Sequence, residues 1–490
     1  MRQVIGIADT AALTTLIIHW NLCMGTIASY SADRPDLMLI LEELQSFDAV
    51  GEFMLTEVGH GLDARSLETT ATQLQDGSFD LHTLKVTAAN AMPPATPYSS
   101  MPRIAVVFAR LVVGGEQRGI QPCVVRLHDA TTMAPGITSR LLLSRPGAKV
   151  VDHTVTTFTH VRLDASASSA AALTLRKTSA GGSWTTSTAS PSAPCPCPSF
   201  TSRDFASAPT CWVDTASGAL TCASVFDAFA TATIAEFMEA SSQQVRSALA
   251  TIFKQTVTHT TKPLYTEMVE RCGWQGLYNH NQLQELALAV QGTSIAEGDI
   301  LVLCIRLASE VLLGRYNLPE AKDPTSLLAQ HELGICEEAR QLAMAAMTSQ
   351  GSNRNEEFNT MILPRVRKLV LATGQRAAYE AAVASGTMMP AMLGLYEASC
   401  ILEDPSWYVK KAGLASADVY RRHAEAVHEL LPSLDALLQN TGGESWATAP
   451  ILEEASWLDF IQRLPTFRSE DKTNAQGKRA AGQGEIKWRL

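Results

Sequence analysis

The chain is short of charge, of aromatic residues and of long apolar runs. Only 18% of its 490 residues are charged and 6% are aromatic, while 46% are hydrophobic. These proportions are typical of a globular protein with a large core. The net charge of −10 argues against a nucleic-acid surface, because such a surface has to neutralise a run of phosphates. No apolar run looks long enough to cross a bilayer, so we expect no membrane span.

Targeting signals and metal-ligand spacings are also missing. The segment from Met1 to Ile7 is too short and too polar for a signal peptide. The chain ends in Lys-Trp-Arg-Leu, which is not the peroxisomal address Ser-Lys-Leu. Ten cysteines are scattered, and the pair Cys195 and Cys197 is too closely spaced for the usual zinc arrangement. These features predict an intracellular protein with reduced cysteines and no metal site.

Hydrophobic periodicity divides the chain into helical and strand-rich parts. Two β-propensive runs, Ile104 to Val113 and Gly119 to Leu127, flank Gly114 and Gly115 and predict a hairpin. Val150 to Leu163 is predicted to form a half-exposed closing strand. The expected units are a partial N-terminal helical domain at 1–52, a β-domain at 53–163, an atypical segment at 164–223, helical domains at 224–318 and 319–467, and a polar tail at 468–490.

The segment 164–223 differs from the rest of the chain. It is rich in Ser, Thr and Ala, and the proline-rich run from Pro191 to Pro198 interrupts any regular element. We therefore expect a disordered insertion, with helical sequence resuming near Val225.

The stretch from Phe53 to Thr72 carries the most specific signal. An apolar run ends at Thr56 and Glu57, Gly59 and Gly61 then flank a histidine, and β-branched residues follow. We expect a loop leading into a strand, in which the glycines take positive φ and allow close approach to a flat ligand. From the residues alone, an ordinary connection between loop and strand is the favoured interpretation.

A second candidate site lies around residues 272–299. The sequence from Cys272 to Gly276 is typical of a helix end. Further on, Ser294-x-x-Glu297 precedes the apolar run from Ile300 to Leu313 and is typical of a capping box, in which Glu297 would bond to a helix N-terminal N–H. The alternative is that the Glu297 carboxylate acts as a general base.

The residues Thr56-Glu57-x-Gly59-His60-Gly61, followed by Leu67-Glu68-Thr69-Thr70-Ala71-Thr72, resemble the flavin-contacting stretch of the acyl-CoA oxidases, in the acyl-CoA dehydrogenase superfamily. This resemblance implies an α+β fold with N-terminal helices, a middle β-barrel domain and a C-terminal helical bundle. The N-terminal helices would be truncated here. The resemblance also implies FAD, an acyl-CoA substrate, oxygen as electron acceptor, and a homodimer that completes each FAD site across subunits.

The same resemblance implies roles for individual residues. Thr56 would hydrogen-bond the flavin ring, beside Gly59 and Gly61. Glu297 follows the glycine cluster at the family's spacing and would be the catalytic base. Gly273 and Gly276 would let the backbone approach the FAD of the partner subunit, with a helix C-cap as the alternative. His60 is expected to be structural. The family's Trp-Trp-Pro-Gly-Gly is replaced by Asn90-Ala91-Met92-Pro93-Pro94, so we expect a different flavin wall.

The function implied is FAD-dependent oxidation of an acyl-CoA to trans-2-enoyl-CoA with oxygen as acceptor, as in fatty acid β-oxidation. Two alternatives stay open, namely a degenerate relative without activity and a dehydrogenase that uses another electron acceptor. The family implies a peroxisomal location, but the C-terminus lacks Ser-Lys-Leu, so a cytoplasmic location is also open.

Overall fold

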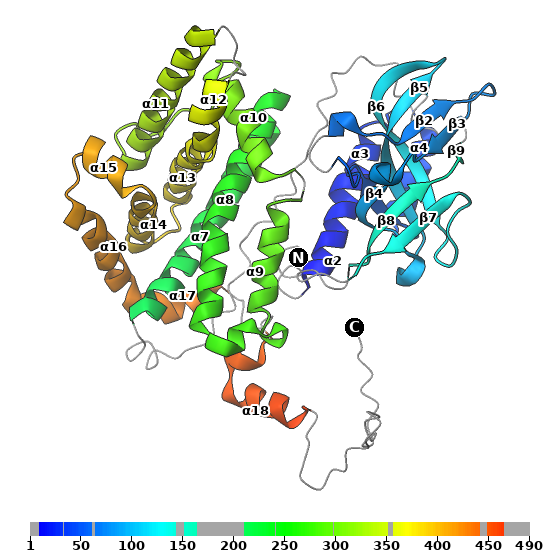
Figure 1. Cartoon of the computed structure of the whole chain (residues 1–490). Helices are drawn as coiled ribbons and strands as arrows, with labels where there is room; N and C mark the ends of the chain where they lie inside the picture. The colour runs from blue at the N-terminus through cyan, green and yellow to red at the C-terminus, as the bar shows by residue number, and fades with distance from the viewer. Residues whose placement is uncertain are drawn as a thin grey trace, which may run out of the picture.

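Two bodies of structure make up the molecule in the computed structural model, which describes residues 9–32, 34–60, 64–143, 151–163, 210–240, 242–296, 298–350, 356–441 and 448–464. We call residues 9–163 the sheet lobe and residues 210–464 the helical lobe. Figure 1 shows the sheet lobe in blue and cyan and the helical lobe in green to red. The succession of helices, strands and further helices confirms the predicted α+β class.

The sheet lobe begins with short helices. These are α2 (Thr10–Ile17), the π-helical turn η1 (Ile18–Met24), α3 (Gly25–Ala28) and α4 (Pro35–Gln45). Asp9 caps α2, because its carboxylate accepts hydrogen bonds from the N–H groups of Ala11 and Ala12 at 2.8 and 2.9 Å. Pro35 occupies the first turn of α4, where its missing N–H costs no helical hydrogen bond.

The long strand β5 organises the sheets. The strands are β1 (Val50–Met54), β2 (Thr70–Gln73), β3 (Phe79–His82), β4 (Asn90–Pro94), β5 (Arg103–Val113), β6 (Glu116–His128), β7 (Ile137–Leu141), β8 (His153–Phe158) and β9 (Val161–Leu163). One edge of β5 pairs with β6 and the other pairs in parallel with β1 and then β2. β3 and β9 extend this sheet, and a second sheet has the order β4-β8-β7.

Side-chain alternation along β5 gives the sheet two buried faces. Ile104 and Val106 pack with Leu37 and Leu44 of the N-terminal helices. The residues that alternate with these two along β5, including Val107, point to the opposite face and pack in a second apolar cluster. The apolar run that predicted a strand is therefore buried on both sides.

The predicted hairpin is confirmed, but the predicted closing strand is wrong in one respect. Gly114 and Gly115 join β5 to β6 with φ of +59° and +81°, values that glycine adopts without strain. The run from Val150 to Leu163 forms two strands in different sheets, not one. The break lies at His160, whose φ of +50° turns the chain from β8 into β9.

A buried ion pair lies under the start of β5. Glu52 of β1 has no exposed surface, and its carboxylate accepts a hydrogen bond from the Arg103 guanidinium, which is 4% exposed. A carboxylate oxygen of Asp152 lies 4.0 Å from the other terminal nitrogen of that guanidinium. Burial raises the pKa of Glu52 to about 8, against the opposing attraction of Arg103.

The helical lobe has one large apolar cluster and two smaller ones. Its helices are α7 (Thr210–Glu239), α8 (Gln243–Arg271), α9 (Leu283–Thr293), α10 (Ile300–Leu312), α11 (Leu327–Gln350), α12 (Glu356–Met361), α13 (Val366–Ser385), α14 (Pro390–Glu403), α15 (Pro405–Lys411), α16 (Ser416–Leu430), α17 (Leu434–Asn440) and α18 (Glu454–Gln462). Phe229 of α7 and Phe253 of α8 meet in the large cluster with their ring centroids 5.1 Å apart.

One expectation about α7 is corrected. The helix begins at Thr210, within the segment that we expected to be a disordered insertion, and Val213, Leu220 and Cys222 are buried. Residues 164–209 lie outside the described residues. By length and composition alone, two stretches, Ala11–Ala28 and Val213–Glu239, could cross a bilayer. This is weak evidence for a membrane, since half of the second stretch is buried inside the fold.

Candidate functional site

The loop that follows β1 begins at Thr56 and is tied to β4. The Thr56 carbonyl accepts a hydrogen bond from the Ala91 N–H at 2.8 Å. The Thr56 side chain is half-buried, and its hydroxyl has no hydrogen-bond partner among the described residues. The bond to Ala91 therefore fixes the backbone of Thr56 against β4.

Glu57 holds this loop closed, which the sequence did not predict. The side chain is 1% exposed, and its carboxylate accepts hydrogen bonds from the N–H groups of Glu68 and Thr69 at 2.9 and 2.8 Å. The Thr69 hydroxyl in turn donates to the Ala88 carbonyl at 2.9 Å. A buried carboxylate that satisfies two backbone donors fixes both ends of the loop relative to β2.

Gly59 is explained by packing inside the loop. Its N–H donates to the Thr87 carbonyl at 2.8 Å, and a Cβ at this position would lie 3.0 Å from the Thr87 Cβ. The positive φ that we expected at Gly59 is not found. The close approach of Thr87, and not the backbone conformation, is what favours glycine at this position. Gly61 lies outside the described residues. His60 contacts Glu68, with 3.3 Å between Nε2 and Oε1, in agreement with a structural role.

Strand β4 contains an unsatisfied amide. Asn90 is 1% exposed, and neither atom of its side-chain amide has a hydrogen-bond partner among the described residues. Leaving such a group unpaired costs about 1–3 kcal/mol. Asn90 forms a backbone bridge with Glu57, next to Thr56. The Asn90 amide is closed to solvent, so a ligand could reach it only after local movement.

The connection between α9 and α10 contains the position of the predicted base. Glu297 itself lies outside the described residues. Asp299 is the N-cap of α10, because its carboxylate accepts from the N–H groups of Leu301 and Val302 at 2.9 and 3.3 Å. Ser294 instead ends α9. The capping-box alternative for Ser294 and Glu297 is therefore wrong, since the helix that Ser294 would cap begins only at Ile300.

The glycine cluster forms the end of α8, as one of the two interpretations predicted. Gly273 has φ of +59° and starts a 3-10 turn, η5 (Gly273–Leu277). A Cβ on Gly276 would lie 2.2 Å from the Val269 carbonyl oxygen, so only glycine fits there. A positive φ accounts for Gly273 and packing against the Val269 backbone accounts for Gly276, and a cofactor role for them stays a prediction.

The structure does not bring all the predicted residues together in one chain. Thr56 and Gly59 lie in the sheet lobe, whereas Gly273 and Gly276 lie in the helical lobe. Each hydrophobic cluster of the described residues draws on one lobe only. Within the helical lobe, α9 separates the glycine cluster from the α9–α10 connection, a length of roughly 16 Å at 1.5 Å per residue.

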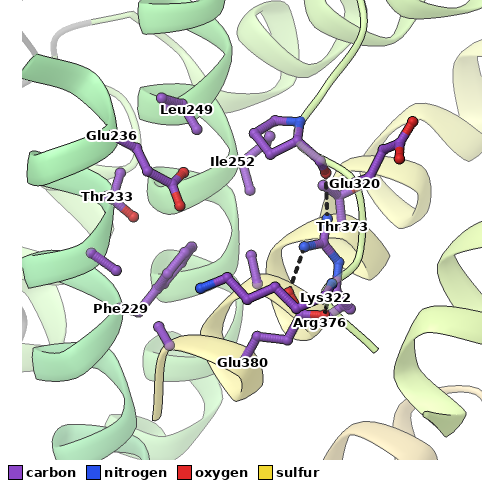
Figure 2. Close-up of a pocket in the computed structure, with 14 residues that line it drawn as sticks. Phe229, Thr233, Glu236, Leu249, Ile252, Glu320, Lys322, Thr373, Arg376 and Glu380 are labelled. Carbon is purple, nitrogen blue, oxygen red and sulfur yellow. Dashed lines mark hydrogen bonds and ion pairs between the residues drawn. The ribbon is translucent and has the colours of Figure 1, made fainter. Parts of the chain in front are cut away.

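A cavity of about 60 Å³ lies elsewhere, among α7, α8 and α13 (Figure 2). Phe229, Leu249 and Ile252 form its apolar part. Arg376 beside it is 4% exposed and fully engaged, since it donates to carboxylates of Glu332 and Glu380 at 2.7 and 2.9 Å. Sites for drug-sized ligands enclose roughly 300–1,000 Å³, so this cavity is too small for an acyl-CoA.

Sequence comparison finds relatives for about a third of the chain. No protein-family model matches. Acyl-coenzyme A oxidase 3 of Yarrowia lipolytica is 31% identical over 165 residues, which are 33% of this chain and 23% of that protein. Acyl-coenzyme A oxidase acox-3 of Caenorhabditis elegans is 31% identical over 142 residues, or 28% and 20% of the two chains. Human peroxisomal acyl-coenzyme A oxidase 3 is 27% identical over 170 residues, or 33% and 23%. The matches therefore span less than a quarter of the curated relatives.

Structural comparison covers almost the whole chain. Acyl-CoA oxidase 3 of Yarrowia lipolytica superimposes with a TM-score of 0.75 at 17% identity, over 94% of this chain and 80% of that one. Acyl-CoA oxidase-1 of Caenorhabditis elegans, solved in complex with FAD and ATP, gives 0.78 at 16% identity over 95% and 81%. At these identities the likeness shows the fold.

Proposed function

We propose that this chain, an acyl-CoA oxidase-like member of the acyl-CoA dehydrogenase/oxidase superfamily, oxidises an acyl-CoA thioester to a trans-2-enoyl-CoA, with FAD as cofactor and oxygen as electron acceptor. The proposal includes a role of the β-oxidation type, a homodimer and a peroxisomal location. The observation that carries it is the Thr56 loop, in which Glu57 fixes the backbone and the Thr56 hydroxyl has no hydrogen-bond partner among the residues that the structure describes.

Thr56 would hold the flavin by a hydrogen bond to the ring, with Gly59 and Gly61 beside it. FAD, when bound, supplies the acceptor for the hydride that leaves the substrate β-carbon. Gly273 and Gly276 would meet the FAD of a partner subunit at the end of α8. The Asn90 amide would gain a hydrogen-bond partner if β4 moved so that the amide reached the flavin ring. That bond would remove the free-energy cost of leaving the amide unpaired.

Glu297 would take the substrate α-proton onto its carboxylate. A general base works best when its pKa lies near the working pH. Burial against flavin and acyl chain raises a carboxyl pKa, and nearby cations lower it. Asp299 is the N-cap of α10, so capping of that helix does not require the Glu297 carboxylate.

Flavin binding and peroxide release test the proposal. The full-length protein is mixed with FAD, freed of excess cofactor and supplied with acyl-CoA of several lengths. We expect the visible absorbance of bound flavin, and hydrogen peroxide formed in step with enoyl-CoA. Glu297→Gln should lower the rate by about 10²–10⁴-fold while flavin stays bound. Full oxidation by this variant would remove Glu297 from the proposal, and a wild-type chain that binds no FAD would contradict the proposal as a whole.

One observation favours a second candidate, a degenerate relative without activity. The Asn90 amide is closed to solvent at the place where the family has its flavin wall. If the segment around Asn90 does not move, the flavin ring cannot bind there, and the protein stays colourless even in excess FAD. The electron acceptor distinguishes the dehydrogenase alternative from an oxidase, because a dehydrogenase would reduce an electron carrier without releasing peroxide.

A further inference from the structure

Lys254 is a buried cation on α8 whose place in the proposed reaction is not evident from the sequence. It is 9% exposed and lies in a stretch, Ala248 to Thr258, in which every residue is buried. A lysine in such surroundings is costly unless its ammonium group is paired or hydrogen-bonded. The position therefore calls for partners that repay the loss of hydration.

The Lys254 ammonium group binds the connection between α9 and α10. It donates hydrogen bonds to the carbonyls of Ala296 and Gly298, the latter at 2.8 Å. These are the two residues on either side of position 297. Two turns along α8, Lys262 donates to the Ser294 hydroxyl at 2.7 Å. One helix thus contacts the connection at three places.

The connection is also closed by its own hydrogen bonds. The Ile300 N–H donates to the Ser294 carbonyl at 3.2 Å, which brings the two ends together. Gly298 has φ of +96°, a conformation that favours glycine. Asp299 caps α10 directly after this turn. The carbonyls in the middle of the connection are held by Lys254.

We propose that Lys254 is a positioning residue, which fixes the α9–α10 connection through the two carbonyls that flank the residue proposed as base. Its effect on catalysis rests on the proposed function, whereas its effect on the connection does not. A displacement of about 1 Å can cost roughly 10²-fold in rate. The cation also favours the ionised form of a neighbouring carboxyl, which is the form that accepts a proton.

The test compares Lys254→Met with Lys254→Arg in the full-length, FAD-loaded protein. Methionine keeps the length and removes the donors and the charge, and arginine keeps both. We expect Lys254→Met to lower kcat about 10²-fold, with KM and flavin content little changed, and Lys254→Arg to recover most of the loss. Lys262→Met should lower kcat less than Lys254→Met does. It removes one bond to the Ser294 hydroxyl and leaves the two bonds to the carbonyls in place.

The pH dependence of kcat gives a readout that a purely structural role would not move. The other charged groups around the connection are Lys262 on α8, Asp299, and Arg367 on α13. Removing the Lys254 charge should shift the acid limb of kcat upward by about one pH unit or more, and Lys254→Arg should leave it in place. A rate near that of the wild type with an unmoved acid limb in Lys254→Met would overturn the inference.

Hydrogen exchange separates a failure of this inference from a failure of the proposed function. In Lys254→Met we expect amide protection around Ala296 and Gly298 to fall about tenfold or more, with the rest of α8 unchanged. Unchanged protection would refute the positioning role whether or not the protein oxidises acyl-CoA. If Lys254→Met does not fold, Lys254→Gln takes its place, because it also removes the charge and keeps a donor. An inactive wild type with the expected loss of protection would refute the proposed function alone.

Discussion

Removing the Glu57 carboxylate should open the loop that carries Thr56. In Glu57→Ala, the N–H groups of Glu68 and Thr69 lose the oxygens that accept their bonds at 2.9 and 2.8 Å. An unsatisfied buried donor costs about 1–3 kcal/mol, so we expect a loss of about 2–4 kcal/mol in the free energy of unfolding. Glu57→Gln keeps one accepting oxygen and should lose about half as much.

Urea unfolding of the three proteins measures this loss. The matched control is Glu116→Ala at the β5–β6 hairpin, whose side chain is 72% exposed, and it should change stability by less than about 0.5 kcal/mol. FAD affinity should fall in Glu57→Ala, because Thr56 loses its fixed backbone. A free energy of unfolding within about 0.5 kcal/mol of the wild type would refute the view that Glu57 holds the loop.

Three further changes test other parts of the structure. Gly276→Ala should destabilise by about 1–3 kcal/mol, because its Cβ would lie 2.2 Å from a backbone oxygen, whereas Gly394→Ala has nothing within 4 Å and should be neutral or stabilising in thermal melts. The pKa of Glu52 is raised from 4.5 to about 8, so its stabilising contribution is complete below pH 4.5 and is lost as the pH rises through about 8. Urea midpoints of the wild type should then fall more steeply between about pH 5 and pH 9 than those of Glu52→Gln. Thr56→Val should weaken FAD binding about 2–10-fold, as expected for one hydrogen bond, in a fluorescence titration with unchanged melting temperature.

Local patterns in the sequence predicted much of the fold. The apolar run from Ile300 onward became α10, and Gly114 and Gly115 became the hairpin turn. The family resemblance added the order of the domains. The start of α7 was missed because its first turns are rich in Ser, Thr and Ala, a composition that is equally common in loops, and only burial in the bundle shows it to be a core helix.

Contacts between distant residues were the part that the sequence could not supply. Ser294 and Asp299 are both good caps by type, and the fold alone decides that Asp299 is used. Lys254 lies more than 40 residues from the carbonyls that it binds, so no local pattern relates them. Glu57 is likewise recognisable in the sequence only as part of a motif. Its bonds to Glu68 and Thr69 form only when the loop closes.

The most direct test of the central claim is peroxide release by the FAD-loaded protein on an acyl-CoA, run beside Glu297→Gln. The account predicts one hydrogen peroxide for each enoyl-CoA in the wild type, and a rate lower by about 10²–10⁴-fold in the variant. A wild-type protein that takes up no flavin, or that binds flavin and leaves acyl-CoA unoxidised, would contradict it.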